Sequence, residues 1–76
     1  IYTMELKIDI LESLVLSLKA RKSKAKVCLD NYLYNSAGIG EHPDIVAESI
    51  KLLEEIDQAD SALNTLYKLY PDELQR

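Results

Sequence analysis

Apolar side chains recur with the period of an α-helix along the first half of the chain. No proline or glycine interrupts residues 4–34. The i, i+3, i+4, i+7 spacing predicts a helix over about residues 4–35 with one buried face, on which Cys28 is a small core residue. The predicted face consists of Met4, Ile8, Leu11, Leu14, Val15, Leu18, Ala25, Cys28, Leu29 and Tyr32.

The same period returns in the second half and predicts a helix over about residues 43–70. Pro71 cannot continue a helix smoothly, so we expect this helix to end at or near Tyr70 and residues 71–76 to form a frayed tail. Two series with a spacing of seven make up its apolar face: Ile45, Leu52, Ala59 and Leu66, and Ser49, Ile56, Leu63 and Tyr70.

A segment with turn-forming residues separates the two predicted helices. Gly38 suits a left-handed residue after the first helix, and Pro43 suits the first turn of the second. We predict a loop over about residues 36–42, with Ile39 folded inward and His42 in a capping or loop role.

A loop this short requires neighbouring helices to run antiparallel. The sequence therefore predicts one all-α domain, residues 1–76, folded as an antiparallel two-helix hairpin. Residues whose numbers sum to about 78 should face each other, which gives the pairs Leu14–Leu63, Leu18–Ala59, Ala25–Leu53 and Tyr32–Val46.

The chain has more apolar side chains than a two-helix seam can bury, because 47% of its residues are hydrophobic. We therefore predict that two hairpins pair into a homodimeric four-helix bundle, or that the surplus binds another protein. The competing interpretation is a monomer with scattered exposed apolar residues. The expected surface for self-association or a partner comprises Leu6, Ile10, Leu16, Tyr67 and Tyr70.

The charges of the two halves are opposite. Residues 1–34 hold six Lys/Arg and four Asp/Glu, and residues 35–76 hold three and nine, which gives +2 and −6, or −4 in total. This asymmetry favours packing of the halves against each other. It does not favour nucleic acid as a partner, because a nucleic-acid-binding protein presents a net basic face.

A basic segment nevertheless runs from Lys19 to Lys26, and Lys19, Lys22 and Lys26 share one helix face. These three side chains are candidate phosphate contacts, which leaves a small nucleic-acid-associated protein as the alternative function. The interpretation that we favour is a solvated cluster with cross-helix ion pairs. Lys22 and Asp60 interrupt the apolar stripes, either to specify the register or to reach solvent at the edge. The expected acidic partners are Glu54, Glu55, Asp57 and Asp60.

No motif carries a recognisable chemistry. His42 is the only histidine and Cys28 the only cysteine, so we expect no metal, no cofactor and no enzymatic activity. A single cysteine fits a reducing compartment, and no apolar run reaches the ~18 residues that span a bilayer. The expected location is the cytoplasm.

The segment from Gly38 to Val46, followed by an acidic helix with Glu54-Glu55-Ile56 and residues 59–63, resembles short uncharacterised helical-hairpin proteins of tailed bacteriophages, including phages of cyanobacteria. The resemblance covers about half of the chain. It implies a viral protein in the cytoplasm of a bacterial host, and it assigns no catalytic or binding residue.

Overall fold

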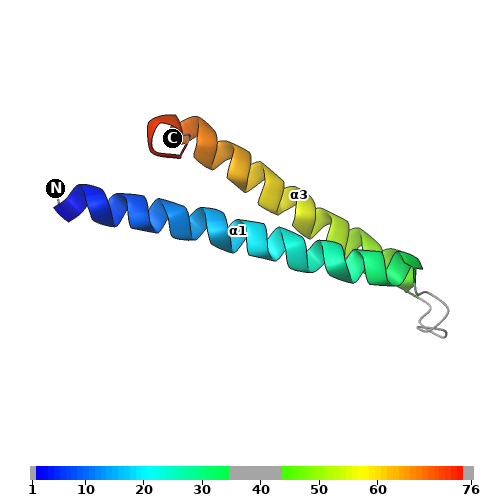
Figure 1. Cartoon of the computed structure of the whole chain (residues 1–76). Coiled ribbons are helices and arrows are strands. Elements are labelled where there is room, and N and C mark those ends of the chain that lie inside the picture. Colours follow the sequence, from blue (N-terminus) through cyan, green and yellow to red (C-terminus); the bar gives the residue numbers. More distant parts are fainter. Residues whose placement is uncertain (1, 35–43, 75–76) are drawn as a thin grey trace.

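The computed structural model describes residues 2–34 and 44–74, apart from the side chain of Tyr2. These residues form α1 (Tyr2–Tyr34), α3 (Ile45–Leu69) and α4 (Pro71–Leu74), and no strand occurs among them. The all-α prediction is confirmed. Helices α1 and α3 run antiparallel as a hairpin measuring 57 × 18 × 17 Å (Figure 1). They diverge toward the end that carries both chain termini, which we call the open end.

A narrow apolar seam joins α1 to α3. The most deeply buried side chains are Leu11, Val15, Ala25, Ala59 and Leu63. On each helix one series of buried and half-buried residues recurs at alternating spacings of three and four, as in a coiled coil. The seam residues are Ile8, Leu11, Val15, Leu18, Lys22, Ala25, Leu29 and Tyr32 on α1, and Ile45, Ser49, Leu52, Ile56, Ala59, Leu63 and Leu66 on α3, with Tyr70 directly after its end.

The predicted buried face of α1 was too wide. Leu14 is 44% exposed, Met4 is exposed, and Cys28 is exposed rather than a core residue. Leu14 and Cys28 are 14 residues apart, so they occupy the same flank of the helix beside the seam. Met4 continues the seam series in its spacing, but it is in the first turn of α1 and its side chain is 59% exposed.

Two of the expected facing pairs are also wrong on the α3 side. Leu53, the predicted partner of Ala25, and Val46, the predicted partner of Tyr32, are both exposed. Each follows directly after a seam residue, and one step along a helix turns a side chain by about 100° away from the interface. The partner predicted for Leu63, Leu14, lies beside the seam for the same reason.

Helix α3 begins at Ile45, two residues later than predicted, and Glu48 provides an acidic side chain in its first turn. It ends at Leu69, as Pro71 predicts, and the N–H of Tyr70 donates to the carbonyl oxygen of Leu66 at 2.9 Å. The predictions for Gly38, Ile39, His42 and Pro43 lie outside the described residues.

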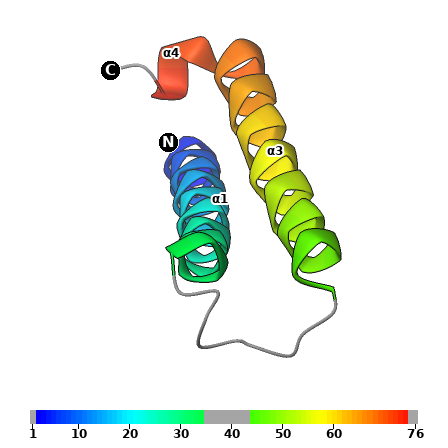
Figure 2. The same ribbon diagram turned by 90° about the vertical axis from the view of Figure 1, so that its right-hand side faces the viewer.

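The frayed tail predicted after Pro71 is wrong for residues 71–74, which form α4. Proline is favourable at the first position of a helix, and Asp72 and Glu73 place negative charge in the first turn, where the helix dipole stabilises it. Viewed along the hairpin, α4 turns from the end of α3 toward the N-terminal end of α1 (Figure 2).

Candidate interaction surface

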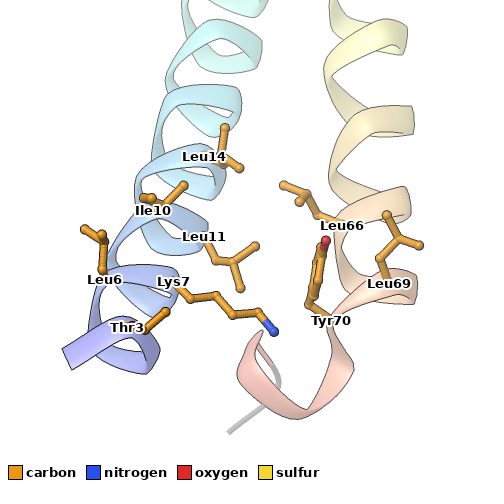
Figure 3. A pocket seen from close by; sticks show the side chains of 9 residues that line it. All are labelled: Thr3, Leu6, Lys7, Ile10, Leu11, Leu14, Leu66, Leu69 and Tyr70. Carbon is orange, nitrogen blue, oxygen red and sulfur yellow. The ribbon is translucent and has the colours of Figure 1, made fainter. Parts of the chain in front are cut away.

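An apolar groove of about 540 Å³ lies between α1 and α3 at the open end (Figure 3). Leu11 and Leu66, both seam residues, line it together with Leu69 and Tyr70 from the end of α3. The remaining lining residues are all on the first four turns of α1: Thr3, Leu6, Lys7, Ile10 and Leu14. The groove is therefore a widening of the seam itself, where the diverging helices no longer fill the space between them.

The large apolar side chains that line the groove outside the seam are open to solvent. Leu6, Ile10 and Leu14 recur at intervals of four along α1 and are 50%, 52% and 44% exposed, and Leu69 on α3 is also exposed. Scattered exposed leucines are normal in soluble proteins, whereas contiguous ones mark interaction sites. Here they are contiguous, because they line one groove.

A charged contact closes the end of the groove. The ammonium group of Lys7 lies 2.9 Å from Oε2 of Glu73 in α4 and 5.3 Å from the centre of the Tyr70 ring. The hydrogen bond to the Glu73 carboxylate, followed by its negative charge, raises the pKa of Lys7 above its ordinary value. Lys7 is thus a paired cation at neutral pH, and among the described residues that line the groove it is the only charged one.

The acidic residues of the first half of α1 are not among the described residues that line the apolar groove, but one of them lies beside it. Asp9 lines a shallow depression of about 260 Å³ with Ile10, Ser13, Leu14 and Ser17, so it lies beside two of the groove residues. Glu5 and Glu12 lie farther round the helix from Leu14, by the 100° advance of each residue. Glu12 lines a second depression of about 340 Å³, with Val15, Leu16, Tyr67, Glu73 and Leu74. That depression is on the other side of the seam and mixes apolar with acidic groups.

The structure divides the five residues predicted for a partner surface between the apolar groove and the mixed depression, and Ile10 also lines the depression that contains Asp9. Leu6, Ile10 and Tyr70 line the apolar groove, whereas Leu16 and Tyr67 line the mixed depression. Leu14, which was expected in the seam, lines the apolar groove instead. The spacing of four residues between Leu6, Ile10 and Leu14 was the feature of the sequence that could have placed Leu14 with the other two.

The basic segment is partly engaged by acidic side chains. Lys22 Nζ lies 2.6 Å from Oδ1 of Asp60 on α3, and Lys26 Nζ lies 2.8 Å from Oδ2 of Asp30 one turn along α1. The hydrogen bond to Asp30 raises the pKa of Lys26. Of the cross-helix pairs expected for this segment, the described residues form the one between Lys22 and Asp60. Two of the three candidate phosphate contacts are thus already ion-paired, while Lys19 lies exposed on the same face.

Within the described ranges, no group of three or more His, Cys, Asp or Glu is placed to hold a metal ion. The helices described here also include none with the length and apolar character needed to cross a membrane. His42 lies outside the described residues. No protein-family model matches the chain, and no curated protein or solved structure matches it either.

Proposed function

We propose that this protein is a non-enzymatic interaction module that self-associates, with a second copy of the chain covering the apolar groove to form a homodimeric four-helix bundle. The observation that carries the proposal is the groove itself, in which exposed leucine and isoleucine side chains are contiguous. Burying them removes apolar surface from water, which is the main driving force for association.

The narrow seam supports the same proposal. Among residues 3–34 and 44–74, only five hydrophobic side chains are deeply buried. Chains of this size are commonly stabilised by oligomerisation, because a single small core contributes little net stability. A second copy would bury the groove and extend the core from two helices to four.

Introducing a charged side chain into the groove tests the proposal, because it should prevent self-association. Ile10→Glu places a carboxylate on the groove wall, and Val27→Glu places one at an exposed position of α1 that does not line the groove. Sedimentation equilibrium from about 1 to 300 μM should show a dimer for the wild type and Val27→Glu, and a monomer for Ile10→Glu. Circular dichroism should show equal helix content in all three. A wild-type protein that stays monomeric over this range would refute the proposal.

The cytoplasmic location and the relation to phage hairpin proteins stay predictions. Under the proposal the role of the protein is structural or regulatory, exerted through its assembly and not through a reaction.

A further inference from the structure

Helix α4 reaches both sides of the seam at the open end. Tyr70, in the bend that leads into this helix, lines the apolar groove on one side, whereas Glu73 and Leu74 line the mixed depression on the other. Figure 2 shows α4 turned from the end of α3 toward the N-terminal end of α1. The short helix therefore extends across the open end, between the two long helices.

Local backbone contacts fix the bend between α3 and α4. The N–H of Tyr70 donates to the carbonyl oxygen of Leu66 at 2.9 Å, and the N–H of Leu74 donates to the carbonyl oxygen of Tyr70 at 3.1 Å. Pro71 follows Tyr70, and its ring restricts the backbone φ angle at the first position of α4. These contacts hold α4 in one direction relative to α3, so α4 must move with α3.

An ion pair joins α4 to α1. The ammonium group of Lys7 lies 2.9 Å from Oε2 of Glu73 and 5.3 Å from the centre of the Tyr70 ring. The Glu73 side chain is 20% exposed, whereas the acidic partners of Lys22 and Lys26 are 45% and 41% exposed. Partly buried charges are screened less by salt and water than exposed ones, so this pair is stronger than the pairs along the basic segment.

Apolar packing contributes little at the same end. Among the described residues, Leu11 on α1 and Leu63 on α3 are the deeply buried side chains nearest the open end. Met4, seven residues before Leu11, is 59% exposed. Lys7 lies between Met4 and Leu11 along α1, so the contact with α4 holds a part of α1 that the seam does not.

We infer that α4 is a strap that keeps the open end closed, and that loss of the pair between Lys7 and Glu73 lets α1 and α3 separate there. Residues of both long helices line the groove, so their separation widens it and brings Leu11 and Leu66 toward solvent. The strap thus regulates how wide the groove is. The inference concerns one hairpin and does not rest on the proposed homodimer.

A distance measurement at the open end tests the strap. In a Cys28→Ser background, which removes the exposed native thiol, spin labels at Glu5→Cys and Lys68→Cys report the separation of α1 and α3 by pulsed electron paramagnetic resonance. Labels at Ser23→Cys and Gln58→Cys, two exposed positions nearer the middle of the hairpin, give the control distance. An excess of unlabelled protein suppresses distances between two copies.

Glu73→Gln should lengthen and broaden the open-end distance relative to the wild type and leave the control distance unchanged, because it removes the carboxylate that holds Lys7. Asp72→Asn is the matched variant, since it removes the same charge from the same helical turn at an exposed position. It should change neither distance. Exchanging the two charges, with Lys7→Glu and Glu73→Lys in one protein, should return the open-end distance toward the wild-type value.

The outcomes for the two acidic variants decide the inference. Identical open-end distances in the wild type and Glu73→Gln would overturn it. Equal lengthening by Asp72→Asn would overturn it as well, because the negative charge of α4 and not its contact with Lys7 would then hold the end. Lengthening in Glu73→Gln alone supports the strap whether or not sedimentation shows a dimer, so the inference and the proposed function can fail separately.

Discussion

Truncation of Leu63 should destabilise the hairpin far more than truncation of Leu53, although the two leucines are on the same helix. Leu63 is 8% exposed and Leu53 is 57% exposed. Replacing a fully buried leucine by alanine forfeits ~2.5 kcal/mol of apolar transfer free energy. Scaling by the buried fraction gives about 2.3 kcal/mol for Leu63→Ala and about 1 kcal/mol for Leu53→Ala.

A cavity term enlarges the difference. Leu63 lies in the seam beside the contact with α1, so its removal leaves space that the helices fill only in part, and the total for Leu63→Ala rises to roughly 3 kcal/mol. Leu53→Ala opens no cavity, because solvent already reaches its side chain.

Urea unfolding followed by far-UV circular dichroism measures both variants against the wild type. The protein concentration should be kept below the dimerisation range, so that association does not add to the measured stability. A small domain has only a few kcal/mol in reserve, and Leu63→Ala should therefore be largely unfolded without denaturant. Equal losses for the two variants would refute the seam described here.

The remaining predictions concern charged and exposed positions. Lys22→Leu should raise the free energy of unfolding by ~1 kcal/mol in a urea titration, because it replaces a cation in the seam with an apolar side chain. The ion pair between Lys22 and Asp60 is half-exposed, so losing it costs little stability. A lower free energy of unfolding in the variant would show that this ion pair contributes more. The stability difference between the wild type and Lys7→Gln should hold from neutral pH to about pH 10.4 and vanish as the pH rises through the folded-state pKa of Lys7. The reason is that the hydrogen bond to Glu73 raises the pKa of Lys7 in the folded protein above its value in the unfolded chain. Thermal melts at several pH values measure this difference, and a difference that grows at alkaline pH would contradict the Lys7–Glu73 pair. Cys28 should react with a thiol reagent in the native protein nearly as fast as in the urea-unfolded protein, since it is exposed. A much slower reaction in the native protein would show that the thiol is buried.

Local signals in the sequence were sufficient for the helices and for most of the seam. The apolar period, the uninterrupted first stretch and Pro71 together predicted an all-α hairpin whose second helix ends beside Tyr70. These features depend on the helix period and on backbone sterics, which act within a few residues. The two apolar series predicted for the second helix lie in the seam for the same reason, whereas the facing positions Val46 and Leu53 were assigned wrongly.

Tertiary packing decided which flank of α1 is buried. Because the apolar stripe of α1 is wider than the seam, the helix could rotate about its own axis and still bury apolar residues against α3. The sequence does not determine how closely the two helices approach at each turn. Leu14 and Cys28 could therefore be assigned to the core by period alone. The structure places both beside it.

Tertiary packing also produces the groove. It exists because α1 and α3 diverge toward the open end and because α4 brings Glu73 to Lys7, 66 positions away along the chain. By itself the sequence determined two amphipathic helices of opposite charge and a surplus of apolar side chains. Only the relative placement of the helices could gather part of that surplus into one surface, since the distance between helices depends on contacts far apart in sequence.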